Sequence, residues 1–267
     1  MTDKIKLTAV NYLNTFPFKY GLEKYADVLN WLEIDYATPF ECAQKLVRQT
    51  THIALAPVAV LAYQPDLKII SDFCLSTNDE VHSVKLYARR PIQDIQSVVL
   101  DYQSLSSVSL VKVLMKHYWK KEVHYIKGQK GFENDLQADA MVVIGDRTFE
   151  LNGHFEYEYD LGKEWYNFYG NPFVFAAWIS NIHLNEEQIY QLNTAFEYGI
   201  RHINDVVTQT LEKTSILNFL DENERKEKIT RYLTQNMHYH LDEQRKQSAR
   251  YFLHLLKDIQ TEPVSVI

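Results

Sequence analysis

The stretch AVNYLNTFPFKYGL, residues 9–22, decides the fold class, because it changes from an apolar run to a helical pattern within a few residues. The run Ile5–Val10 is typical of a buried strand, and a helix is expected from about Phe16, with Asn14 or Thr15 as its N-cap. Similar short runs recur, with helical patterns between several of them, at His52–Pro57, Ser83–Ala88, Ser97–Asp101, Met141–Gly145 and Phe173–Ile179. This alternation predicts an α/β fold with largely parallel sheets.

Composition and charge narrow the class of partner. The chain has 267 residues, 46% of them hydrophobic, and a formal net charge of -7 with scattered basic residues. This pattern gives no electrostatic footprint for nucleic acid or for an anionic membrane surface. No apolar stretch approaches the roughly 18 residues that span a bilayer, and the first residues lack the apolar core of a signal peptide. We therefore expect a cytoplasmic protein whose partner is a small molecule.

Helix signals organise the rest of the chain. Thr38-Pro-Phe-Glu41 is a capping box, and Asn185-Glu-Glu-Gln188 is an N-cap signature that opens an all-helical tail. Two more helices are expected near 222–234 and 242–258. Composition marks no domain boundary, so a chain with two lobes has to cross between them on ordered strands.

Polar residues follow two of the predicted strands directly. Tyr12-Leu-Asn-Thr15 lies where the first strand ends, and open α/β folds bind ligands at that edge of the sheet. Asn or Thr before a helix is more often a plain cap than a ligand contact. After Asp101, the helix start carries Ser104, Ser106 and Ser107. Hydroxyls beside unpaired helical amides can hold a carboxylate or phosphate, and we favour this reading slightly over three serines that only cap and turn.

A third junction, Gly145-Asp146, is a weaker signal. Glycine allows the backbone to approach a ligand, and the aspartate can accept hydrogen bonds or cap the next turn. The chain has no phosphate-binding glycine loop, no dinucleotide fingerprint, no HExxH, no CxxC and no G-x-S-x-G elbow. Cys42 and Cys74 each stand in an apolar context and are expected to be buried free thiols. We therefore expect no metal and no cofactor.

Six stretches together carry a resemblance over roughly residues 5 to 180. They are NYLNTFPFKYGL, IALAPVAVL, EVHSVKLYARRPI, LDYQSLSSVSLVKVL, ADAMVVIGD and YDLGKEWYNFYGNPFVFAAW, in this order. The chain resembles the chorismate dehydratases of the futalosine route to menaquinone. That resemblance implies a periplasmic-binding-protein-like fold of type II, with two α/β lobes around a central ligand cleft and a helical C-terminal segment.

The resemblance also implies where the lobes divide. The larger lobe is expected to be discontinuous, with residues 1–89 and 174–267, and the smaller lobe to hold residues 90–173. The crossovers would be the strands Ser83–Arg90 and Phe173–Ser180. Two positions depart from the family pattern, since Val58 stands where relatives usually have serine and His52 where an acidic residue is common. Because Val58 has no hydroxyl, the role of this position in binding stays open.

The activity that the resemblance implies is loss of water from chorismate, a dicarboxylate, to give 3-[(1-carboxyvinyl)oxy]benzoate without a cofactor. Asn14 and Ser83 would be catalytic and would address the enolpyruvyl side and the departing hydroxyl, while Asn14 positions the carboxylate that removes the ring proton. Either the substrate's own carboxylate or Asp146 would be the base. The substrate-binding residues are expected to be Tyr12, Thr15, Ser104, Ser106, Ser107, Gly145 and Asp146. The oligomeric state stays open.

Two other functions fit the same cleft. The later naphthoate-forming lyase of the pathway usually opens with a Ser-Pro-Cys-Pro-Asn type of motif, which this chain lacks. A non-catalytic protein that binds small anions would use the same fold, and such proteins are normally exported. A fold does not fix a function, so these alternatives are separated only by experiment.

Overall fold

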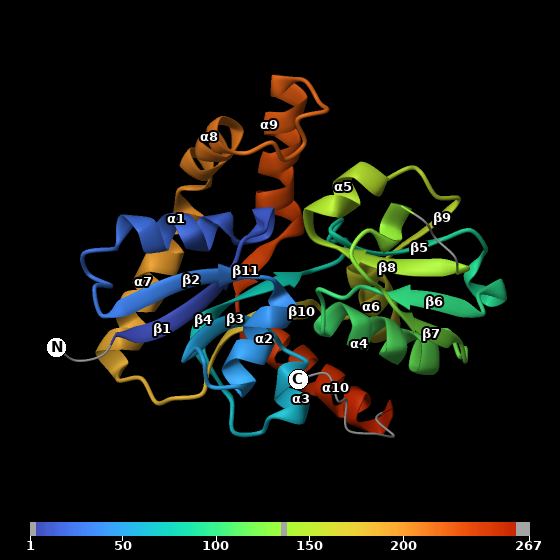
Figure 1. Ribbon diagram of the computed structural model, residues 1–267, viewed down its shortest axis with the longest axis horizontal. Helices are drawn as coiled ribbons and strands as arrows, with labels where there is room; N and C mark the ends of the chain where they lie inside the picture. The colour runs from blue at the N-terminus through green and yellow to red at the C-terminus, as the bar shows by residue number, and fades with distance from the viewer. Residues whose placement is uncertain (1–3, 135–137, 260–267) are drawn as a thin grey trace.

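The computed structural model describes residues 4–134 and 138–259, which form two α/β lobes that lie side by side (Figure 1). The larger lobe has a six-stranded sheet, in the order β11 (His238–His240), β4 (Lys68–Thr77), β10 (Phe173–Ser180), β3 (Ile53–Pro57), β1 (Ile5–Val10) and β2 (Leu32–Ala37). The smaller lobe has a five-stranded sheet, in the order β7 (His124–Lys127), β6 (Ser97–Leu100), β8 (Ala140–Ile144), β5 (Val84–Ala88) and β9 (Tyr157–Asp160). The periplasmic-binding-protein-like architecture is therefore present.

Both sheets are mixed, which corrects the expectation of largely parallel sheets. β1 is parallel to β2 and β3, and β6 is parallel to β7 and β8. β10 is antiparallel to β3 and β4, and β5 is antiparallel to β8 and β9. β5 and β10 each follow a segment that passes from the other lobe. No crossover helix within their own lobe directly precedes them, and such a helix is what usually connects parallel neighbours.

The helices cover the sheets of the two lobes. Those of the larger lobe are α1 (Phe16–Lys24), α2 (Pro39–Val47), α3 (Val60–Tyr63), α7 (Glu186–Arg201), α8 (Ile203–Lys213), α9 (Glu222–Arg231) and α10 (Glu243–Ile259). Those of the smaller lobe are α4 (Ser106–Val113), α5 (Thr148–Leu151) and α6 (Leu161–Tyr169). The capping box predicted at Thr38 and the N-cap predicted at Asn185 are confirmed, and Asn185 forms a capping box as well.

The helical tail contains one element that periodicity did not predict. After α9 the chain continues as a π-helical turn, Tyr232–Asn236, and then adds β11 to the edge of the larger sheet. α10 follows and packs against both β10 of the larger lobe and α4 of the smaller one. The tail therefore connects the lobes as well as covering one of them.

The chain passes between the lobes in loops. The first passage is the segment 78–83 between β4 and β5, and the second is the segment 170–172 between α6 and β10. All of β5 is hydrogen-bonded in the smaller sheet, so this passage comes before the expected boundary at residue 89. β10 lies wholly in the larger sheet. Neither of the two expected crossover strands is shared by both lobes.

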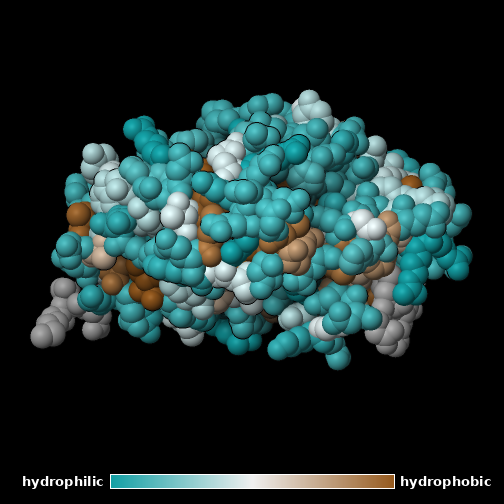
Figure 2. Space-filling view, turned by 90° about the horizontal axis from the view of Figure 1, so that it is seen from above, coloured by the Kyte–Doolittle hydropathy of each residue, from teal (hydrophilic) through white to brown (hydrophobic). Residues whose placement is uncertain are grey.

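The surface of the described residues is largely hydrophilic on the face seen in Figure 2, with small hydrophobic groups between polar ones. The large hydrophobic side chains that are exposed come from separate elements: Val28, Ile126, Tyr166, Tyr190 and Phe219. Scattered exposed apolar residues of this kind are ordinary. Within residues 4–134 and 138–259, no helix combines the length and apolarity needed to cross a bilayer.

The position of α1, and with it the loop before α1, depends on a close crossing with α7. A Cβ on Gly21 would lie 1.8 Å from the Ala195 carbonyl oxygen, and one on Gly199 would lie 1.7 Å from the Pro17 carbonyl oxygen. The two helix backbones are therefore in direct contact. Only residues without a side chain fit here, because neither backbone can move without displacing its sheet.

Gly199→Ala is expected to lower the free energy of unfolding by about 1–3 kcal/mol or more, since the added methyl forces the helices apart. Urea denaturation followed by circular dichroism measures the change. Tyr190→Ala, on an exposed position of the same helix (67% exposed), is the control and should change stability little. An alanine at residue 199 that left the midpoint unchanged would contradict the close contact.

Candidate active site

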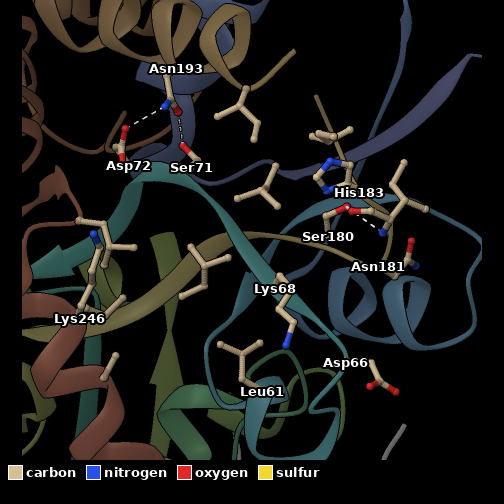
Figure 3. A pocket seen from close by; sticks show the side chains of 18 of the residues that line it. Leu61, Asp66, Lys68, Ser71, Asp72, Ser180, Asn181, His183, Asn193 and Lys246 are labelled. Atoms are coloured by element: carbon tan, nitrogen blue, oxygen red, sulfur yellow. Dashed lines mark hydrogen bonds between the residues drawn. The ribbon is translucent and has the colours of Figure 1, made fainter. Parts of the chain in front are cut away.

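One cavity lies within the larger lobe and has a volume of about 790 Å³. Its walls come from β4, β10, α7 and α10, and Figure 3 shows the Asn193 side chain turned toward Ser71 and Asp72. Ser180 donates to the His52 carbonyl at 2.8 Å, and Asn181 donates to the Thr51 carbonyl at 2.9 Å. Asn193 pairs with Ser71 at 2.7 Å. These polar groups already have protein partners, so they offer few free contacts for a specific ligand.

The second cavity lies between the lobes, where strand ends from both sheets meet. It is small, about 50 Å³, but most of the predicted site residues line it. Seven of the nine predicted site residues line it: Tyr12, Asn14, Ser83, Ser104, Ser106, Ser107 and Gly145. Thr15 and Asp146 do not line it. Because polar groups from separate strand ends of both lobes converge here, we take this cavity as the candidate site, despite its smaller volume.

Asn14, Ser83 and Tyr232 form a buried polar group at this cavity. The Tyr232 hydroxyl donates to Ser83 Oγ at 2.7 Å and also interacts with the Asn14 side chain. Burial raises the pKa of Tyr232 well above its ordinary value, so the phenol stays protonated and remains a donor. Asn14 Oδ1 is buried and has no hydrogen-bond partner among the residues that the structure describes. An acceptor left in this state at a cavity wall is suited to receive a hydrogen bond from a ligand.

The three serines of the smaller lobe have different partners. Ser104 Oγ accepts from the Ser107 backbone N–H at 3.0 Å, which is a capping contact at the start of α4. Ser106 Oγ accepts from the Ala59 N–H of the larger lobe at 3.2 Å. Thus one serine caps the helix and one joins the lobes, while Ser107 adds a third buried serine to the cavity wall.

Several contacts hold the two lobes in a closed arrangement. The Tyr12 hydroxyl donates to Gln103 Oε1 at 2.8 Å, and the Phe40 N–H donates to the Gln103 carbonyl at 3.1 Å. Gly145 has φ +71°, and a Cβ there would lie 3.0 Å from the Tyr12 ring. Glycine at this position therefore serves both the left-handed backbone and the close approach of the lobes.

Asp146 joins the lobes from the same junction. Its carboxylate accepts from the Leu13 N–H at 3.2 Å, and burial raises its pKa to about 6 although that hydrogen bond opposes the shift. A carboxylate with a raised pKa beside a cleft is typical of functional sites. Thr15, by contrast, directs its hydroxyl to the carbonyls of Val10 and Tyr12, at 2.6 and 2.7 Å, and neither it nor Asn14 makes the predicted side-chain cap.

Four residues of this region were not among the predicted ones: Arg147, Asp101, Gln103 and Tyr232. Arg147 donates to buried Asp101 at 2.6 Å and to Gln103 Oε1 at 3.0 Å. The opposite charges of Arg147 and Asp101 at two strand ends were a usable signal. No sequence signal pointed to Tyr232. The helical period of the tail does not show which face of a helix lies at a cleft that other segments form.

Titratable side chains are not arranged as a metal site in the part of the chain that the structure describes: no group of three His, Cys, Asp or Glu residues could hold an ion. Cys42 and Cys74 are buried free thiols, as expected, and burial raises the pKa of both. The cavity wall carries hydroxyls, an amide and aromatic rings, and the carboxyl of Asp146 lies beside it.

Two mixed α/β lobes around an interlobe cleft define a protein of the periplasmic-binding-protein-like class. Solved structures similar to this chain include a protein of Archaeoglobus fulgidus (TM-score 0.73, 13% identity, 96% of this chain and 98% of that chain). They also include a Candida albicans gene product described as exhibiting the generic periplasmic binding protein fold (0.66, 11%, 98% and 92%). A third is the periplasmic aliphatic sulphonate binding protein of Escherichia coli (0.60, 9%, 100% and 91%).

The sequence comparisons are more specific than the fold. The chain belongs to the menaquinone biosynthesis family, whose model it matches over residues 5–258. It is also similar to a chorismate dehydratase of Thermus thermophilus, with 26% identity over 189 residues, which cover 61% of this chain and 69% of that protein.

Asp146→Asn is expected to stabilise the protein at pH 8, by about 1–3 kcal/mol, because it removes a buried charge. The folded-state pKa of about 6 lies above the ordinary 3.8, so ionisation costs stability as the pH rises through this window. The gain in melting temperature should therefore shrink as the pH falls to about 4.

Asp139→Asn is a control of opposite sign for this measurement. Hydrogen bonds from the Gln96 and Ser97 backbone lower the pKa of Asp139, so its neutral replacement should destabilise the protein at pH 8. Equal effects of both variants at every pH would show that the burial of Asp146 is not what shifts its pKa.

Proposed function

We propose that this protein is a carbon–oxygen lyase that dehydrates chorismate to 3-[(1-carboxyvinyl)oxy]benzoate in menaquinone biosynthesis by the futalosine route. The observation that carries the proposal is the Asn14, Tyr232 and Ser83 group, with its unpaired buried acceptor, at the cleft of a chain of this family. The similar chorismate dehydratase of Thermus thermophilus supports the choice of substrate.

The reaction removes one ring proton and the neighbouring hydroxyl, and the ring becomes aromatic. The elimination is therefore strongly downhill, and the enzyme has mainly to orient the substrate and exclude competing reactions. A cleft of hydroxyls, amides and aromatic rings is sufficient for this task.

In our proposal the substrate's enolpyruvyl carboxylate removes the ring proton. Asp146 is the other candidate base, but its carboxylate is held by Leu13 and it is not on the cavity wall. Asn14 Oδ1 is an acceptor, so it disfavours the ionised carboxylate and makes it a stronger base. When the carboxylate takes the proton, it gains an O–H that Asn14 can accept. This hydrogen bond forms during the chemical step, which is when binding lowers the barrier.

Ser83 is proposed to donate to the departing hydroxyl. Its Oγ already accepts from Tyr232, so its own hydrogen is free to point into the cleft that Ser83 lines. The second carboxylate of the substrate is assigned to Ser107 and the first amides of α4, where the helix dipole favours negative charge.

Substrate entry requires the lobes to separate. The closed cleft, at about 50 Å³, is far smaller than the roughly 300–1,000 Å³ of ligand sites in general. The contacts that have to open include the hydrogen bond between Ala59 and Ser106 and the one between Tyr12 and Gln103. Their loss on opening also frees Ser106 for the substrate.

The deciding experiment is incubation of the purified protein with chorismate without added metal or nucleotide. We expect mass spectrometry to find a product lighter by one water. Chorismate that binds in calorimetry but returns unchanged would favour a protein that only binds small anions. If chorismate neither binds nor reacts, the substrate of the later naphthoate-forming step is the next to test.

Asn14→Ala is expected to lower kcat by about 100-fold, by analogy with the removal of one polar group that acts in a transition state. The measurement is steady-state turnover of chorismate. Thr208→Ala, on the exposed side of α8, is a control for handling and folding. An Asn14→Ala protein with wild-type turnover would end the catalytic assignment of this residue.

Tyr232→Phe is expected to lower kcat about tenfold, because Ser83 loses the hydrogen bond that orients it. Tyr239→Phe is a matched control: Tyr239 is also buried and lies seven residues further along, but its hydroxyl has no hydrogen-bond partner within residues 4–134 and 138–259. We expect Tyr239→Phe to keep the wild-type kcat. If both variants lost the same activity, general packing rather than the Tyr232 hydroxyl would be responsible.

A further inference from the structure

The first passage between the lobes ends at Ser83, and a single carboxylate of the smaller lobe holds it. Asp160 is the N-cap of α6, where its side chain accepts from the N–H groups of Gly162 at 3.0 Å and Lys163 at 3.2 Å. The same carboxylate accepts from the N–H of Val81 at 3.1 Å and of His82 at 2.6 Å. Asp160 is only 8% exposed. Four backbone donors on one buried carboxylate are more than a helix cap requires.

His82 has a backbone conformation that its side chain disfavours. Its φ is +61°, in the left-handed region, which costs a residue with a Cβ roughly 1–2 kcal/mol. Strain of this kind persists only where surrounding contacts impose it. The short hydrogen bond from the His82 N–H to Asp160 is such a contact.

The surroundings leave this segment little room. A Cβ on Gly162 would lie 2.5 Å from the Asp79 carbonyl oxygen, so the start of α6 touches the passage directly. Thr77 Oγ1 donates to the carbonyls of Asp79 and Glu80, at 3.2 and 3.1 Å. The turn is thus fixed at its beginning by Thr77 and at its end by Asp160.

The residue after His82 is Ser83, whose orientation depends on this turn. The Ser83 carbonyl accepts from the Gly145 N–H at 2.9 Å, and its hydroxyl accepts from Tyr232. Relaxation of His82 to a right-handed or extended backbone would rotate Ser83 away from both partners. Misplacement of a reacting group by about 1 Å can cost on the order of 100-fold in rate.

We propose that Asp160 is a positioning residue for Ser83: its carboxylate holds the His82 backbone in the left-handed conformation that turns the Ser83 hydroxyl into the cleft. Asp160 does not line the cavity, so it acts through Ser83 and does not touch the substrate. The expected effect on kcat rests on the proposed function, in which Ser83 donates to the departing hydroxyl.

Asp160→Asn tests the proposal, because the amide keeps one acceptor oxygen and replaces the other by a group that cannot accept. We expect kcat for chorismate to fall about 10- to 100-fold while KM changes less than about threefold. Asp221→Asn is the matched control, since Asp221 caps α9 through the Glu224 N–H alone. The Asp221→Asn protein should keep kcat within about twofold of the wild-type value. An Asp160→Asn protein with wild-type kcat would overturn the inference.

A second substitution separates positioning from simple capping. Glycine adopts the left-handed conformation without strain, so Asp160→Asn/His82→Gly should regain about tenfold in kcat over Asp160→Asn. The residue that caps α6 is the same in both proteins, so a difference between them does not come from the cap. If the double variant shows no recovery, Asp160 acts on α6 alone and the inference is wrong.

Hydrogen exchange distinguishes this inference from the proposed function. In the ligand-free protein, Asp160→Asn should accelerate amide exchange in peptides that cover 78–84. The double variant Asp160→Asn/His82→Gly should show the same fast exchange, because glycine does not replace the lost acceptor. A wild-type protein that leaves chorismate unchanged refutes the proposed function but not a role of Asp160 in holding this segment. Unchanged exchange over 78–84 refutes the role of Asp160, whatever the substrate.

Discussion

The carboxyl ends of strands from two separate sheets point into one space, and the polar chemistry of this protein depends on that convergence. β1 leads to Tyr12 and Asn14, β6 leads to the serines at the start of α4, and β8 leads to Gly145. None of these groups forms a site within its own lobe. The convergence in turn depends on glycines at close approaches, since Gly199 sets α1 against α7 and Gly145 lies under the Tyr12 ring.

Burial makes the polar groups of the cleft selective. A phenol, a serine hydroxyl and an amide placed away from water have few partners other than one another, so each has a defined orientation. The oxygen of Asn14 is the exception, and leaving a buried acceptor unpaired costs free energy. A ligand that donates to it recovers this cost, which is a physical reason for specificity without a strongly charged side chain on the cavity wall.

Local signals in the sequence predicted local structure well. β1 has the bounds that the apolar run indicated, and the capping boxes at Thr38 and Asn185 are present, because such features depend on neighbouring residues. Most of the predicted site residues also meet at one cavity. The sequence did not predict Tyr232, the hydrogen bond from Ala59 to Ser106 or the early passage at 78–83. Each of these depends on how segments distant in the chain pack together, and no short pattern records that.

The strand order of the larger sheet also constrains how the chain folds during synthesis. β4 lies between β10 and β11, so both of its neighbours are made only after the whole smaller lobe has been translated. Until then its ten residues, KIISDFCLST, form a strand with two unpaired edges and several apolar side chains. The smaller lobe, which is contiguous in sequence, can complete its sheet first. A slow ribosome or a truncated chain would therefore leave both edges of β4 unpaired, and an unpaired strand edge is a site for pairing with another molecule.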